Sequence, residues 1–252
     1  MTPYITDAAA WQESWDRQQA AYLPDREHRF ATLLDAVDTV TDGAPPRLLD
    51  LAGGTGTISL RTLARFPDAQ VTLLDLDPAL LAIATTSLAG RATVVTADLS
   101  HSDWSATLPH REYDAVLTAT ALHWLPADRL AGLYAEIRDV LRPGGILANA
   151  DHMPDDALPE LTKRLTARAQ ARRAARYAAG AVLSWSDWWD RAGTDPALAP
   201  LVERRQAIYP TGHSPEWNPP VSWHLAALAD AGYAEVGTLW RGGADAAVVA
   251  VR

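Results

Sequence analysis

A glycine-rich turn, placed between a short apolar run and the start of a helix, is the feature that most constrains this chain. The apolar run Leu48–Leu51 follows Pro45 and Pro46, a pattern that predicts a buried strand. The sequence Gly53-Gly54-Thr55-Gly56 comes next and is followed by a predicted helix over residues 57–65. Glycines lack a β-carbon, so the backbone there can approach a ligand closely, and the first amides of a helix have no partner within it. The stretch therefore predicts a nucleotide-binding turn at the end of a strand.

Acidic residues end the next two predicted strands. Val71–Asp75 is a second apolar run, and its acid lies about 20 residues beyond the turn, where such units place a ribose-binding carboxylate. The third run, residues 92–97, is followed by Asp98, which can cap the turn at residues 103–104. A dinucleotide fingerprint is incomplete, because Ser59 occupies the position of its last glycine. A nicotinamide-dependent oxidoreductase is therefore a weaker alternative that stays open.

Five short motifs between residues 25 and 150 occur together and in one order. They are Leu49-Asp50-Leu51-Ala52-Gly53-Gly54-Thr55-Gly56, Leu74-Asp75-Leu76-Asp77, Ala97-Asp98-Leu99, Tyr113-Asp114-Ala115-Val116-Leu117 and Leu141-Arg142-Pro143-Gly144-Gly145. In this combination the chain resembles the class I S-adenosylmethionine-dependent methyltransferases. The run Ala121-Leu122-His123-Trp124-Leu125 is similar to the small-molecule branch of that family, which contains the trans-aconitate methyltransferases. Ala52 is a departure, because the family usually has glycine at that position.

The resemblance implies an enzyme that binds S-adenosylmethionine and methylates an oxygen, nitrogen or carbon atom of a small molecule, such as a specialised metabolite. A protein that binds this cofactor without catalysis is a second alternative. Asp75 would bind the ribose, Asp98 and the Leu99 backbone the adenine, and Arg26 or Arg29 the methionine carboxylate, unless these arginines are solvated. The predicted cofactor-binding residues are Arg29, Asp50, Ala52, Gly53, Gly54, Gly56, Asp75, Leu76, Asp98, Leu99 and Ala119.

The resemblance also implies an α/β fold, namely a Rossmann-like, doubly wound, seven-stranded sheet with a C-terminal antiparallel hairpin and a mainly helical cap insertion. We expect a single methyltransferase domain over residues 1–252. Within it we predict an N-terminal helical arm or lid (1–45), a cofactor-binding core (46–150), a helical cap insertion (151–212), and a C-terminal helix and hairpin that complete the sheet (213–252). Asp25, Asp77 and Ser186 are predicted helix N-caps, and residues 207–209 have a strand-like pattern.

The predicted substrate site combines two histidines with several aromatic residues. Methyl transfer from a sulfonium requires that acceptor and methyl carbon are held in line and away from water, and a base is needed only where the acceptor must lose a proton. His123 and His152 follow the fourth and fifth predicted strands, so both should face the cleft as candidate catalytic bases, although a lone histidine is more often structural. The residues predicted to line the substrate pocket are Trp15, Tyr22, His123, Trp124, Trp185 and Trp188.

A predicted helix over residues 157–179 carries an unusual stripe of arginines. Arg164, Arg168, Arg172 and Arg176 recur at a spacing of four residues, so they share one side of that helix. The stripe is either a solvated face or a cationic surface that attracts an anionic substrate or partner.

Composition limits the remaining possibilities. The formal net charge of -9 disfavours nucleic acid as a partner, and the absence of cysteine excludes disulfides, thiolate zinc sites and a cysteine nucleophile. No apolar run is long enough to cross a membrane, and the N-terminal residues lack the pattern of a signal peptide, so we expect a cytoplasmic protein without a membrane partner. No compact cluster of ligands predicts a metal site.

Overall fold

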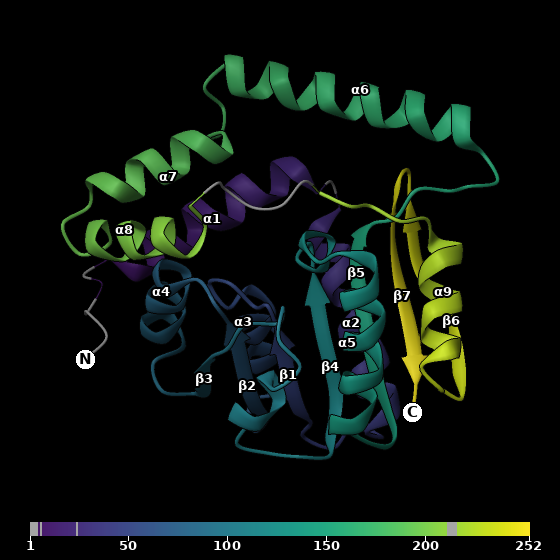
Figure 1. Ribbon diagram of the computed structural model, residues 1–252. Helices are drawn as coiled ribbons and strands as arrows, with labels where there is room; N and C mark the ends of the chain where they lie inside the picture. Colours follow the sequence, from purple (N-terminus) through teal and green to yellow (C-terminus); the bar gives the residue numbers. More distant parts are fainter. Residues whose placement is uncertain (1–4, 6, 24, 211–215) are drawn as a thin grey trace.

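The computed structural model describes residues 5, 7–23, 25–210 and 216–252 (Figure 1). At its centre is a seven-stranded sheet with the strand order β3-β2-β1-β4-β5-β7-β6. The strands are β1 (Arg47–Leu51), β2 (Gln70–Asp75), β3 (Ala92–Thr96), β4 (Tyr113–Ala119), β5 (Leu141–His152), β6 (Glu235–Gly242) and β7 (Asp245–Val251). The first five strands are parallel, whereas β7 pairs antiparallel with both β5 and β6. The predicted α/β fold with a C-terminal antiparallel hairpin is confirmed.

Helices cover both faces of this sheet. On one face pack α2 (Arg26–Val40), α3 (Thr57–Arg65) and α4 (Pro78–Leu88), and on the other pack α5 (Ala127–Val140) and α9 (Val221–Asp230). Successive strand residues alternate between the two cores, so that Leu48 packs with the first group of helices and Leu49 with the second. The continuous apolar runs of the sequence therefore correspond to strands that are covered on both sides.

The N-terminal helix and two later helices share a third core above the sheet. These helices are α1 (Ala8–Tyr22), α7 (Trp185–Thr194) and α8 (Ala199–Ile208), and they pack together with α4. Trp188 lies at their centre, with its ring centroid 4.9 Å from that of Trp15 and 5.4 Å from that of Trp11. The long helix α6 (Pro159–Ala178) extends across the top of Figure 1, apart from the sheet, and contacts α1.

Several local expectations need correction. Residues 207–209 contain the end of α8 rather than a strand, and Asp25 has a left-handed backbone (φ 63°) without a side-chain capping bond. Ser184, not Ser186, caps α7, in a reciprocal pair with Asp187. Asp77 caps α4 as predicted.

The turn at residues 143–145 lies within β5, which runs from Leu141 to His152. A β-carbon on Gly145 would lie 2.9 Å from the carbonyl oxygen of Tyr113 and 3.1 Å from that of Asp114. Glycine thus permits a close approach of β5 to β4, where the pairing of these strands shifts its register between Tyr113 and Ala115.

The predicted boundary at residues 212 and 213 lies outside the described residues, as does most of the segment before α1. Among the helices that the structure does describe, none combines the length and the apolar character needed to cross a membrane.

Candidate active site

A cavity of about 590 Å³ lies at the carboxyl ends of the parallel strands. Its walls include residues of α1, α7 and α8, which pack above this edge of the sheet. The predicted site residues that line it are Trp15, Tyr22, Asp50, Ala52, Gly53, Gly54, Asp75, Leu76, Asp98, Leu99, Ala119, His123, Trp124, His152 and Trp185. Three predicted residues, Arg29, Gly56 and Trp188, are not part of the lining.

The glycine turn is built around the buried carboxylate of Asp50. One oxygen of Asp50 accepts hydrogen bonds from the amide nitrogen (2.9 Å) and the hydroxyl (2.7 Å) of Ser59, near the start of α3. A β-carbon on Gly53 would lie 2.7 Å from this carboxyl group, so that position requires glycine. Burial raises the pKa of Asp50 to about 6. Ala52 has φ 53°, a left-handed conformation that explains why glycine is usual there.

Gly56 serves packing rather than the cavity. It has φ 85°, and a β-carbon on it would lie 3.1 Å from Leu73 and 3.4 Å from Leu88. The missing side chain therefore allows the start of α3 to approach β2 and α4. Gly56 does not line the cavity, and its predicted role in cofactor binding stays a prediction.

Asp75 connects the end of β2 to the glycine turn. Its two carboxylate oxygens accept hydrogen bonds from the amide nitrogens of Gly54 and Asp77, each at 2.8 Å, and burial raises its pKa. Each oxygen retains a lone pair that can accept a hydroxyl proton, as a ribose site requires. Asp98 accepts a hydrogen bond from the Ser100 amide nitrogen at 2.8 Å and does not cap the helical turn that begins at Trp104.

Arg26, rather than Arg29, lies at the cavity. The guanidinium of Arg26 donates to Asp16 at 2.8 Å, and its Nε has no partner among the described residues. Arg29 is fully buried on another side of α2, where it donates to Asp245 at 2.9 Å and stacks on Trp240. Guanidinium nitrogens of both arginines lack partners among the described residues, so only their positions distinguish them: Arg26 lines the cavity and Arg29 does not.

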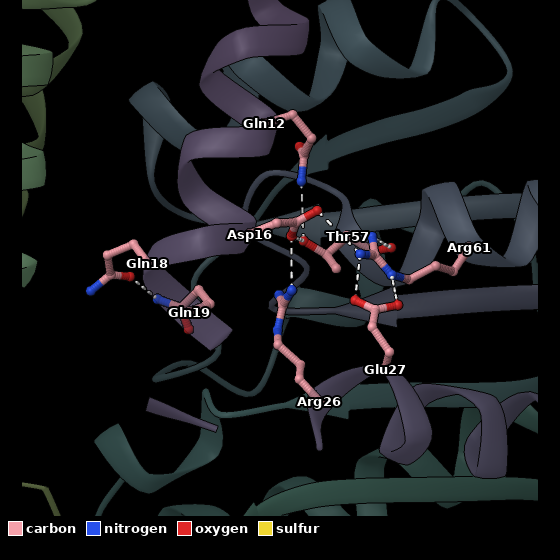
Figure 2. A network of polar contacts seen from close by, with 8 residues as sticks. All are labelled: Gln12, Asp16, Gln18, Gln19, Arg26, Glu27, Thr57 and Arg61. Carbon is pink, nitrogen blue, oxygen red and sulfur yellow. Dashed lines mark hydrogen bonds and ion pairs between the residues drawn. The ribbon is translucent and has the colours of Figure 1, made fainter. Parts of the chain in front are cut away.

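A network of polar contacts fastens α1 to the glycine-turn helix (Figure 2). Asp16 on α1 accepts hydrogen bonds from Arg26 of α2 and from Thr57 and Arg61 of α3. Burial opposes the ionised form of Asp16, but the charge of Arg26 and its hydrogen bond nevertheless hold the Asp16 pKa below its ordinary value. The roof of the cavity is thus tied by charge to the elements that form its floor.

Two histidine–carboxylate pairs lie side by side at the cavity. His123 Nδ1 is 2.8 Å from Asp151 Oδ1, His152 Nδ1 is 2.6 Å from Asp245 Oδ1, and the two imidazole centroids are 6.1 Å apart. Burial alone would raise the pKa of Asp151, but the charge and hydrogen bond of His123 lower it below its ordinary value. Burial likewise opposes the charged form of His152, yet the hydrogen bond and charge of Asp245 raise the His152 pKa.

The aromatic wall of the cavity differs from the prediction in one residue. Trp188 is fully buried in the core shared by α1, α7 and α8, whereas its neighbour Trp189 lines the cavity. The guanidinium carbon of Arg205 lies 3.9 Å from the Trp189 ring centroid, and Arg205 also donates to Asp77 at 2.7 Å. The cavity residues that sequence reasoning missed include Trp189, Arg205, Tyr209 and Glu216.

Two further predictions concern the arginine stripe of α6 and the absence of a metal site. The four stripe arginines are exposed on α6, and none of them lines the cavity. Over residues 5, 7–23, 25–210 and 216–252, no group of three or more histidine, aspartate or glutamate side chains is arranged to hold a metal ion.

Comparison with known proteins gives a consistent family. A family model described as "Methyltransferase domain" matches residues 48–145. The trans-aconitate 2-methyltransferase of Acidovorax ebreus (strain TPSY) is 32% identical over 195 residues, which cover 75% of this chain and 69% of that relative. The malonyl-[acyl-carrier protein] O-methyltransferase of Laribacter hongkongensis (strain HLHK9) is 34% identical over 168 residues, which cover 60% of this chain and 53% of that relative.

A solved structure shares the fold. Human N-acetylserotonin methyltransferase in complex with S-adenosylmethionine matches 97% of this chain and 58% of its own length, with a TM-score of 0.55 and 16% sequence identity.

Proposed function

Because this chain is an enzyme of the class I S-adenosylmethionine-dependent methyltransferase family, we propose that it methylates a hydroxyl oxygen of a small molecule held in the cavity. When bound, the cofactor supplies an electrophilic methyl group that leaves its sulfur as the acceptor oxygen attacks. Family membership removes both alternatives, the nicotinamide-dependent oxidoreductase and the non-catalytic binding protein. The curated relatives are named for trans-aconitate and for a malonyl group on a carrier protein, so their acceptors differ in kind.

The proposed cofactor site uses the floor of the cavity. Asp75 accepts the ribose hydroxyls, the glycine turn leaves room for the backbone to approach, and Asp98 with the Leu99 backbone binds the adenine. Of the two arginines considered for the methionine carboxylate, we assign Arg26, which is supported by its place in the cavity lining, where Arg29 is absent.

The single observation that supports a hydroxyl oxygen as the methyl acceptor is the pairing of His123 with Asp151. The buried carboxylate of Asp151 lies 2.8 Å from His123 Nδ1, an arrangement that favours a proton on Nδ1 and leaves Nε2 as a proton acceptor. A hydroxyl group must lose its proton as it is methylated, whereas a carboxylate need not, so a base of this kind favours a hydroxyl.

His152 has a separate proposed role as a cation. Its pKa is raised beside Asp245, so a larger share of its imidazole is protonated near neutral pH than burial alone would allow. The imidazole centroids of His152 and His123 are 6.1 Å apart, which supports a role for this charge beside an oxygen that transfers its proton to His123. A nearby positive charge stabilises the developing oxyanion.

The helical layer completes the proposed substrate site. Trp15, Tyr22, Trp124 and Trp185 supply apolar walls, which suit a flat or apolar acceptor. We propose that α1 acts as the lid and that α6, α7 and α8 form the cap predicted for residues 151–212.

The experiment combines product identification with two variants. We expect mass spectrometry to find O-methylated product from a panel of hydroxylated aromatic and apolar compounds, with N- and C-methylated products absent. Asp151→Asn and His123→Ala should each lower kcat by about 100- to 10,000-fold at unchanged affinity for S-adenosylhomocysteine. His28→Ala, which changes an exposed histidine of α2, is the matched control. Wild-type kcat in the His123 variant, or methylation at nitrogen, contradicts the proposal.

A further inference from the structure

Helix α6 is held to the rest of the molecule by a narrow side only. Thr162 is its single buried residue, and Arg173 stacks on Tyr22 of α1 at 4.2 Å from the ring centroid. Tyr22 itself lines the cavity. Arg173 of α6 therefore contacts a residue of the cavity lining, and α6 extends across the top of the molecule (Figure 1).

The outer side of α6 has an apolar end and a cationic end. Leu158, Leu161 and Leu165 are 52%, 50% and 44% exposed, which is unusual for side chains of this size. At 100° per residue, Arg168, Arg172 and Arg176 continue the same side of the helix toward its C-terminus. From Leu158 to Arg176 the surface is about 27 Å long, too long for one small acceptor.

The charge of α6 is opposite to that of the remaining chain. The helix carries six cations and one acid, a net charge of +5, so the remaining residues carry -14 within the total of -9. A cationic surface held on an acidic body selects an acidic partner, because the body repels an anionic surface that approaches elsewhere.

The arrangement of leucines and arginines favours a protein over a membrane. A helix that lies in a bilayer interface places its apolar residues on one side and its cations on the other. On α6 the leucines and Arg168, Arg172 and Arg176 occupy the same side, so immersion of the leucines would push arginines toward the apolar layer. A protein surface with an apolar patch beside carboxylates complements this pattern.

We propose that this side of α6 is the docking surface for a small acidic carrier protein that presents the methyl acceptor on a flexible arm. This inference rests on the proposed function, because it assumes that the cavity receives a methyl acceptor. Leu158, Leu161 and Leu165 contact the apolar patch of the carrier, and Arg168, Arg172 and Arg176 pair with its carboxylates. The arm would reach the cavity past α1, whose Tyr22 lines the cavity and contacts Arg173 of α6.

Binding to purified acyl carrier protein in its phosphopantetheine-bearing form tests the proposal without any methylation assay. Calorimetry should show saturable binding at low salt that weakens at least about tenfold at high salt, where exposed charges are screened beyond roughly 8–10 Å. Arg168→Glu/Arg172→Glu should weaken binding at least about tenfold, and Leu161→Ser/Leu165→Ser should also weaken it. Arg111→Glu/Arg204→Glu, a charge-matched control at two exposed arginines outside α6, should bind as wild type.

Several outcomes overturn the docking surface. These are absence of saturable binding, equal loss in the control variant, and binding that ignores the α6 substitutions. Adsorption to phosphatidylglycerol vesicles that is lost in Arg168→Glu/Arg172→Glu, without binding to the carrier, would assign the surface to a membrane instead. If free hydroxylated compounds are methylated but the carrier does not bind, only the docking proposal fails. If the carrier binds as expected while His123→Ala keeps its activity, only the proposed chemistry fails.

Discussion

His123 and His152 each pair with a carboxylate of their own, and the two carboxylates come from different strands. Asp151 belongs to β5, so the His123 pair depends on the middle of the sheet. Asp245 begins β7 and also accepts a hydrogen bond from Arg29 of α2, at 2.9 Å. Arg29 lies outside the cavity and holds Asp245 in place. Through Asp245 it therefore helps to position His152.

The raised pKa of His152 predicts a pH-dependent contribution to stability. A group whose pKa is higher in the folded state stabilises that state fully below its unfolded pKa of about 6.5, and this stabilisation is lost as pH rises through the folded pKa. Between mildly acidic and alkaline pH, wild type should lose on the order of 1 kcal/mol more stability than His152→Gln. Urea unfolding across that pH range measures the difference. Parallel stability curves for the two proteins would contradict the raised pKa.

Sequence reasoning located most of the cavity residues at strand ends, but it could not decide which residues of the surrounding helices face the cavity. Asp75 ends β2 and Gly53 comes shortly after β1, and the end of a parallel strand places a residue at the cleft whatever else packs nearby. Arg26 and Arg29 share the first turn of α2, and Trp188 and Trp189 are adjacent on α7. Which of each pair faces the cavity depends on how the helix is rotated, and packing of distant elements sets that rotation.

At the scale of elements, Asp16 should matter more than any other charge on α1. It is 22% exposed and contacts cations of two other helices, whereas the Glu13–Arg17 pair on the same helix is 68% and 60% exposed. Asp16→Asn removes charge from a half-buried network and should cost about 2–4 kcal/mol of unfolding free energy, against less than about 0.5 kcal/mol for Glu13→Gln. Urea unfolding of both variants gives the comparison. Equal effects would show that the network does not hold α1 in place.

The elements differ in how far the sequence determines them. α3 spans Thr57–Arg65 as predicted, because the glycine turn fixes its start and Pro67 limits its end. The strand-like pattern at residues 207–209 was misleading, because α8 gains its order from the tryptophan core and from the bond between Arg205 and Asp77. Those partners lie far away in the chain, so no local pattern can reveal them.

At the scale of the whole molecule, cofactor binding should stabilise the fold. A ligand at one hundred times its Kd adds about 2.7 kcal/mol of unfolding free energy, which corresponds to a Tm increase of roughly 5–10 °C for a chain of this size. We expect such an increase with S-adenosylhomocysteine and none with NAD, measured by differential scanning fluorimetry.

Asp75→Asn provides the internal control for that measurement. The loss of a charge-assisted hydrogen bond of about 1.5–3 kcal/mol should weaken cofactor binding by roughly tenfold or more. The Tm increase at the same ligand concentration should then fall to about half or less, relative to the Tm of the unliganded variant. An undiminished increase would mean that the ribose does not contact Asp75.

The strand order also bears on how the chain assembles. β6 precedes β7 in the sequence, yet β7 lies between β5 and β6. During synthesis, β6 leaves the ribosome before β7. Because β6 pairs with β7 alone, it has no strand to pair with until β7 has also been made. Ile146 pairs with Val251 across a large separation in the chain, and such non-local pairing forms slowly. The edge of β5 stays uncovered during that interval, and this is the period when a newly made molecule is most open to aggregation and to capture by chaperones.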